Sequence, residues 1–221
     1  VIDSPQSSRL VLMKAHKNPS SSPWLSIPIR NGEFQYDFYA DHEEVYEVFI
    51  WNDMLTGSWL PSLFFAENGP VSFTLYPAST RKPGLVSTSN PLTCELQQLE
   101  SERKAKFNFD SLYAQMNKLY EENRFESEAL QTLWKRIEQV KDNNEERNNI
   151  YRERDRLEES GEAYTEEGKA LLVKIKQLNE EMNQWTIKHI KQNPSLPGLY
   201  VLTSKTEMAR KGEDVTPFLN A

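Results

Sequence analysis

The chain has 221 residues, of which 38% are hydrophobic, and its 33 acidic and 26 basic side chains give a formal net charge of −7. This length is sufficient for a sizeable core, and the acidic balance argues against a nucleic-acid partner. A single cysteine, Cys94, excludes an internal disulfide, a C-x-x-C redox pair and a multi-cysteine metal site within these residues. No apolar run approaches the roughly 20 residues that span a bilayer, so no transmembrane segment is predicted.

Proline and glycine divide the chain near residue 90. Prolines recur and apolar residues alternate up to Pro91, whereas residues 92–193 contain no proline and only two glycines, Gly161 and Gly168. Alternation with period two is typical of strands, and long proline-free stretches favour helices. We therefore predict an α+β protein: a β domain over residues 1–89, built as a small antiparallel β-sandwich or open barrel, followed by a helical domain over residues 90–221.

The first strands are predicted from alternation and from one turn. Residues 9–15 and 44–51 have strand-like composition, and residues 24–40 have the pattern of a hairpin around Asn31-Gly32. The pair Asn-Gly tolerates the positive φ angles of a tight hairpin turn. Apolar side chains alternate on both sides of it, at Leu25, Ile27 and Ile29 before the turn and at Phe34, Tyr36 and Phe38 after it.

A second hairpin is predicted over residues 59–77, with Asn68-Gly69 at its tip. Glu67 lies beside this tip, between two apolar and aromatic runs, and a displayed carboxylate could act in acid–base chemistry. That chemistry needs a second titratable group within hydrogen-bond reach, and the local sequence offers none. Glu67 is therefore interpreted as a turn residue at a solvent-facing crest.

The second half is predicted to consist of helices at about 91–106, 109–123, 126–159, 165–192 and 195–204. The fourth carries a seam with steps of four and three, which favours a single partner helix; its members are Leu171, Ile175, Leu178, Met182, Trp185 and His189. The facing stripe is predicted at Leu130, Leu133, Trp134, Ile137 and Val140. The two helices would form a long antiparallel hairpin over about 126–192, whose polar tip at 141–163 is expected to be the most mobile part.

No catalytic, cofactor-binding or metal site is predicted. The stretch HEEVY at 42–46 resembles the zinc motif H-E-x-x-H, but Tyr46 replaces the second histidine and the segment has a strand pattern. Cys94, near the start of a helix among leucines, is interpreted as a small buried hydrophobe. Trp51 and Trp59, with Trp24, would provide a stacking platform for sugars or peptides if they were exposed; aromatic residues in strands are more often core.

Several turn and cap motifs together resemble the N-terminal region of Bacteroidetes cell-envelope thioredoxin-like proteins, a domain of unknown function called DUF4369 with a helical segment after it. The similar stretches are IPIRNGEFQYDF, LFFAENGPVSFTL, LVSTSNPLTCELQQLES and IKQNPSLPGLYVL. The matching residues are Asn31, Gly32 and Phe34 in the first turn, Phe65, Glu67, Asn68 and Gly69 in the second, Asn90 at the first helix, and Asn193, Pro194 and Ser195 at the last junction.

The chain departs from this family in three respects, one of which is an expected shortening of the first strand, because family members have residues before the position of Val1. Ser87-Thr88 stands where the family has a glycine followed by Ser or Thr, and the C-x-x-C thioredoxin domain that usually follows is absent from these residues. The resemblance implies a periplasmic or outer-membrane-tethered accessory module, without activity of its own, whose partner is a downstream thioredoxin domain or another envelope protein. Two alternatives stay open: a glycan- or peptide-binding module of the envelope, and a scaffold that oligomerises through the helical hairpin.

Overall fold

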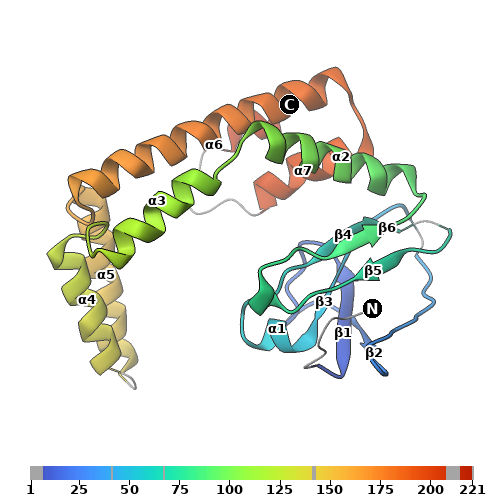
Figure 1. Ribbon diagram of the computed structural model, residues 1–221, viewed down its shortest axis with the longest axis horizontal. Helices are drawn as coiled ribbons and strands as arrows, with labels where there is room; N and C mark the ends of the chain where they lie inside the picture. Colours follow the sequence, from blue (N-terminus) through green and yellow to red (C-terminus); the bar gives the residue numbers. More distant parts are fainter. Residues whose placement is uncertain (1–6, 41, 67, 141–142, 208–214, 221) are drawn as a thin grey trace. The chain divides into compact units, whose positions relative to one another are not determined.

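The computed structural model describes residues 7–40, 42–66, 68–140, 143–207 and 215–220. It shows an α+β protein in which two antiparallel sheets are followed by helices (Figure 1), and no closed barrel forms within these ranges. The chain divides into two compact units: Val1–Glu102 with Ile187–Ala221, here the first unit, and Arg103–Thr186, the second unit. The predicted boundary at residue 90 separates strands from helices. The first unit instead combines the sheets with most of the helix that begins at Pro91 and with the C-terminal helices.

Among the described residues, six strands form the sheets of the first unit. Four of them pair in the order β2-β1-β3-β4, namely β1 (Arg9–Lys14), β2 (Leu25–Pro28), β3 (Val45–Ile50) and β4 (Ser62–Phe65). The other two, β5 (Ser72–Thr74) and β6 (Leu85–Ser87), form a separate ribbon. Two short helices lie between strands, α1 (Trp51–Leu55) and the 3-10 turn η1 (Ala78–Thr80). Neither β6 nor α1 was predicted, and α1 begins at Trp51, which the sequence placed in a strand.

The four-stranded sheet buries both of its faces. Alternate residues of the strands point to opposite sides, so Leu10, Val48 and Phe64 lie on one face, where the β5–β6 ribbon packs through Phe73 and Val86. The other face carries Val11, Met13 and Phe49, which pack against Trp24, Trp51 and Met54. Burial on both faces explains why the strands contain unbroken apolar runs rather than strict alternation.

The first predicted hairpin exists only at its turn. Asn31 and Gly32 have φ angles of 53° and 78°, and Arg30 and Glu33 exchange two backbone hydrogen bonds of 2.8 and 2.9 Å. The next hydrogen-bonded pair of such a ladder would join residues 28 and 35, but Pro28 has no N–H to donate. The ladder stops there, and residues 34–40 form no strand, contrary to the prediction.

The second predicted hairpin, over residues 59–77, is wrong. Its two arms belong to different sheets, because β4 pairs with β3 whereas β5 pairs with β6. At the predicted tip, Gly69 has a φ angle of 139°. Glu67, which was predicted to mark the tip, lies outside the described residues.

The helices are α2 (Pro91–Lys106), α3 (Asp110–Glu121), α4 (Glu128–Gln139), α5 (Asn144–Ser160), α6 (Glu166–Gln192), α7 (Leu196–Glu207) and α8 (Thr216–Leu219). The bounds of α2, α3, α6 and α7 agree closely with the predicted ones, the prediction differs between residues 126 and 159, and α8 was not predicted. None of the helices described is both long enough and apolar enough to cross a membrane.

The predicted helix over residues 126–159 is two helices, α4 and α5, which lie side by side (Figure 1). Val140 ends α4 with a ψ angle of 52°, and the Asn143 side chain caps α5 by accepting from the backbone N–H groups of Glu145 and Glu146 at 3.2 Å. The apolar stripe of α4 therefore packs against Ile150 of α5, and not against α6 as predicted. The predicted tip at 141–163 includes two residues outside the described ranges, but Ile150 within it is fully buried.

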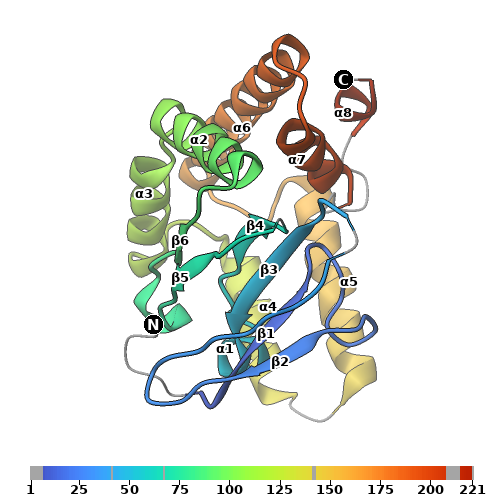
Figure 2. The same cartoon turned by 90° about the vertical axis from the view of Figure 1, so that its right-hand side faces the viewer.

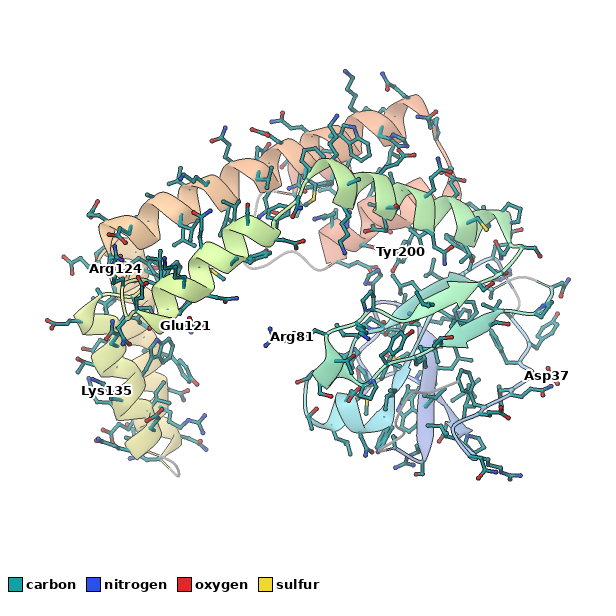
Figure 3. The ribbon with its side chains drawn as sticks, viewed as in Figure 1. Asp37, Arg81, Glu121, Arg124, Lys135 and Tyr200 are labelled. Atoms are coloured by element: carbon teal, nitrogen blue, oxygen red, sulfur yellow. The ribbon has the colours of Figure 1, made fainter. Side chains whose placement is uncertain are left out.

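Two helix N-termini are joined in the second unit, those of α4 and α6. Ser127 N–H donates to the Ala163 carbonyl at 3.0 Å, and Thr165 N–H donates to the Phe125 carbonyl at 3.1 Å, so the two entering segments form a short antiparallel bridge. Arg124 binds both carboxylate oxygens of Glu167 at 2.5 and 2.6 Å. Figure 3 labels Arg124 at this junction.

Candidate binding groove in the first unit

A groove of about 1020 Å³ lies in the first unit. Its floor is the sheet face that carries Leu12, Ile27, Val48 and Phe64, and its walls are two chain segments, residues 34–40 and residues 68–74. Six aromatic rings lie in or beside these walls, those of Phe34, Tyr36, Phe38, Tyr39, Phe64 and Phe73. We call this feature the aromatic groove.

The wall at residues 34–40 keeps the alternation of a strand although it forms none. Phe34 and Phe38 pack onto the core of the sheet, and Tyr36 between them is 44% exposed. The intervening Gln35, Asp37 and Tyr39 are exposed, and Tyr39 reaches 87%. In Figure 2 this segment is part of the blue trace between β2 and β3.

The rings of the groove contact one another. Phe38 meets Tyr46 edge-on with ring centroids 5.1 Å apart, and Phe64 meets Phe73 at 5.1 Å. Phe34 and Phe73 lie 6.4 Å apart, which connects the two walls at one end. Such contacts fix the rings in place, so the groove presents a preformed apolar surface.

The charged side chains that line the groove are acidic. Asp37 and Glu43 belong to its lining together with His42, and the lining contains no lysine or arginine within the described ranges. Neither carboxylate forms an ion pair with a described residue. Asp37 lies at the outer edge of the first unit (Figure 3), where water still solvates it. The groove therefore combines an apolar floor with a rim of uncompensated negative charge.

Several of the residues singled out by the family resemblance lie at the groove or at the start of α2. Phe34, Asn68 and Gly69 line the groove, beyond the Asn31-Gly32 turn. Phe65 and Asn90 meet elsewhere, at the start of α2. The Asn90 amide donates to the Phe65 carbonyl at 3.1 Å, and its Oδ1 accepts from the N–H groups of Leu92 and Thr93 at 2.8 and 3.0 Å.

Thr93, which sequence reasoning missed, completes this second junction. Its hydroxyl accepts from the Phe65 N–H at 2.9 Å, so both backbone groups of Phe65 on the outer edge of β4 are bound by the first turn of α2. Thr93 is fully buried. The junction blocks this part of the sheet edge and leaves no ligand site there.

The tryptophans do not form an open platform. Trp51 contacts Trp24, with ring centroids 5.0 Å apart, and the Arg9 guanidinium, 4.2 Å from its ring centroid. These two neighbours take up part of its indole surface. Trp59 is 36% exposed and contacts Phe49 at 5.9 Å. A ligand could reach the edge of Trp59 but could not stack between these rings.

A titratable cluster lies on the opposite side of the sheet. The Nε2 atom of His16 is 2.7 Å from the Ser204 hydroxyl, and the His16 ring stacks on Tyr200 at 5.0 Å. Burial lowers the pKa of His16, raises the pKa of Glu47 to about 7, and raises the pKa of Tyr200 to about 12. The Ser204 hydroxyl opposes the rise at Tyr200, but its geometry falls short of a hydrogen bond to the phenol.

The pair of Ser204 and His16 does not amount to a nucleophile and its base. The Ser204 hydroxyl also donates to the Tyr200 backbone carbonyl at 2.6 Å. Its single proton can therefore be used in that bond, while His16 Nε2–H donates to the hydroxyl oxygen. A hydrolytic site needs, in addition, a group that orients the histidine and donors for an oxyanion. The described residues place neither at this pair, which we interpret as a link between the end of β1 and α7.

Neither Cys94 nor the histidines suggest a metal or redox centre. Within the described ranges no three His, Cys, Asp or Glu side chains gather as metal ligands would. Cys94 is exposed rather than buried as predicted, and its Sγ lies 3.5 Å from the Thr88 carbonyl. It points outward because the buried positions of α2 are taken by Thr93, Leu96 and Leu99.

Comparison of the chain with protein-family models, with curated proteins and with solved structures found no match.

Proposed function

We propose that the chain is a non-catalytic binding module and that the aromatic groove is its binding surface. The observation that carries this proposal is the combination of about 1020 Å³ of concave space, clustered aromatic rings and two carboxylates without an ion pair among the described residues, all in one place. Preformed concave sites with apolar walls and a few polar groups are the usual form of binding sites.

The resemblance to DUF4369 adds a setting to this proposal. It implies an accessory module of a cell-envelope thioredoxin-like protein, in which the chemistry belongs to a redox domain elsewhere. Phe34, Asn68 and Gly69, which carry part of the resemblance, line the groove, and this supports a link between the motif and the surface. A C-x-x-C motif encoded downstream would support the setting, and the absence of one would leave a stand-alone binding module.

The oligomerisation alternative has less support from the helical unit. A second chain would have to bind the apolar stripe of α4. Ile150 and Leu157 of α5 already cover this stripe within the same unit. The tryptophan platform is likewise less favoured, because Trp51 is already in contact with Arg9 and Trp24.

The proposal predicts that ligands perturb the groove and not the tryptophan patch. We expect soluble glycans or extended peptides to shift the backbone amide resonances of residues 34–40 and 68–74 in titrations followed by nuclear magnetic resonance. Tyr36→Ala, which removes a half-exposed groove ring, should weaken binding by about fivefold or more, since aromatic anchors dominate such surfaces. The matched variant Trp59→Ala should bind as the wild type does. Shifts confined to residues near Trp59 would refute the proposal.

A further inference from the structure

The wall of the groove at residues 34–40 has the composition of a strand but no strand partner. Its sequence FQYDFYA alternates aromatic and polar residues, which strongly favours a strand. Within the described ranges none of its backbone N–H or C=O groups makes a hydrogen bond. Local preference and observed pairing therefore disagree at this segment, although they agree in the neighbouring strands.

The structure explains why none of the described strands pairs with this segment. Pro28 interrupts the ladder that would join β2 to residues 34–40, and the turn at Arg30 and Glu33 is the last point of pairing. The segment is nevertheless held in place, since Phe34 and Phe38 pack onto the sheet core. An anchored segment of strand-like composition whose backbone groups make no hydrogen bond to the described residues is a candidate template for strand addition.

From these observations we propose that the groove binds an extended peptide with cationic side chains, which adds as a strand along residues 34–40. This inference rests on the proposed function of the groove. The main-chain hydrogen bonds would supply affinity, and alternate side chains would enter the apolar groove floor at Ile27 and Phe64. Asp37 and Glu43 would attract lysine or arginine at the rim, where the lining provides no competing cation within the described residues.

The test uses a synthetic peptide of alternating valine and threonine with lysines at its ends and centre, titrated into the full chain. Two altered peptides accompany it: one with N-methyl groups on its central backbone nitrogens, and one with glutamate in place of lysine. N-methylation removes the donors of a ladder without changing the side chains. We expect the methylated peptide to bind roughly tenfold or more weakly, and the glutamate peptide also to bind more weakly.

Paired substitutions in the protein test the same ladder from the other side. Successive residues of a strand direct their backbone groups to opposite edges, so Tyr36 and Tyr39 belong to different edges. We compare Tyr36→Pro with Tyr36→Ala, and Tyr39→Pro with Tyr39→Ala, after checking that melting temperatures agree within each pair. Strand addition predicts that one proline variant, and only one, binds about five- to tenfold more weakly than its alanine control.

Asp37→Asn tests the charged rim. It should weaken binding of the lysine peptide at low salt and leave it unchanged at high salt.

The outcomes separate this inference from the proposed function. Equal binding of the methylated peptide, or no difference within either proline–alanine pair, overturns strand addition while the groove remains a binding surface. Binding of glycans without binding of any peptide overturns the inference in the same way. If neither glycans nor peptides shift resonances of the groove, the proposed function fails with it.

Discussion

Glu47 places a carboxyl group on the buried face of β3, between Met13 and Leu63 of the neighbouring strands. Burial raises its pKa to about 7, from an ordinary value of 4.5, and no described residue forms an ion pair with it. The folded state therefore prefers the protonated acid. Its stabilising contribution to the free energy of unfolding of the first unit is fully present below pH 4.5. This contribution decreases by about 3 kcal/mol in total as the pH rises from 4.5 to 7.

Glu47→Gln should remove this loss, because the amide is similar in shape and carries no charge at any pH. We expect the variant to be more stable than the wild type at pH 8, by up to about 3 kcal/mol, and similar to it at pH 4.5. Urea unfolding followed through backbone resonances of β1 and β3 at several pH values measures this difference. An equal difference at both pH values would contradict the assignment.

His16 acts with the opposite sign and serves as the control. Burial lowers its pKa, so the folded state prefers the neutral ring, and this contribution is present above the ordinary value of 6.5 and declines as the pH falls below it. In His16→Gln that acid-side decline should disappear while the loss between pH 4.5 and 7 remains. The two variants together separate the two groups.

At the scale of single elements, the sequence predicted what local rules determine. The helix bounds of α2 and α6 and the turn at Asn31-Gly32 follow from proline placement, periodicity and positive φ preference. The break between α4 and α5 was missed because residues 140–143 contain neither proline nor glycine. Asn143 signals this helix start as a cap, but the signal is weak among many polar residues.

Long-range pairing could not be predicted in the same way. The turn signal at Asn68-Gly69 suggested a hairpin, yet β4 and β5 lie in different sheets, and which strand pairs with which depends on the packing of the whole core. The groove was missed for a similar reason, since residues 34–40 and 68–74 are brought together only by the sheet beneath them. Its members Phe34, Asn68 and Gly69 had been identified, but as turn residues.

Gly168, in the first turn of α6, tests the junction of α4 and α6. In an open helix, alanine at such a position would stabilise by about 1 kcal/mol. Here a Cβ atom would lie 2.4 Å from the Phe125 carbonyl oxygen, which accepts from Thr165 N–H. Because that oxygen is backbone, the bridge must move, and we expect Gly168→Ala to destabilise the second unit by about 1–3 kcal/mol. Lys174→Ala on the same helix is the control, and thermal unfolding measures both variants. A higher melting temperature of Gly168→Ala than of the wild type would show that the contact with Phe125 is loose.

At the scale of the whole molecule, the division into two compact units makes a prediction about how the chain opens. Each unit has its own core: Val11, Met13 and Phe49 belong to the first, and Leu130, Leu133 and Ile150 to the second. Local opening follows such cooperative units, and substitutions in separate cores act almost independently. A substitution in one core should therefore lower the protection of amides from hydrogen exchange in that unit and leave the other unit protected.

Ile150→Ala is the sharpest probe of this independence, because the side chain is fully buried between α4 and α5. Removing it should cost about 2–4 kcal/mol and accelerate exchange of α4 and α5 amides, while protection in β1 and β3 stays at the wild-type level. The reciprocal variant Val11→Ala should affect β1 and β3 alone. Loss of protection in both units from either substitution would mean that the helices shared between them, α2 and α6, transmit unfolding and that the chain opens as one cooperative body.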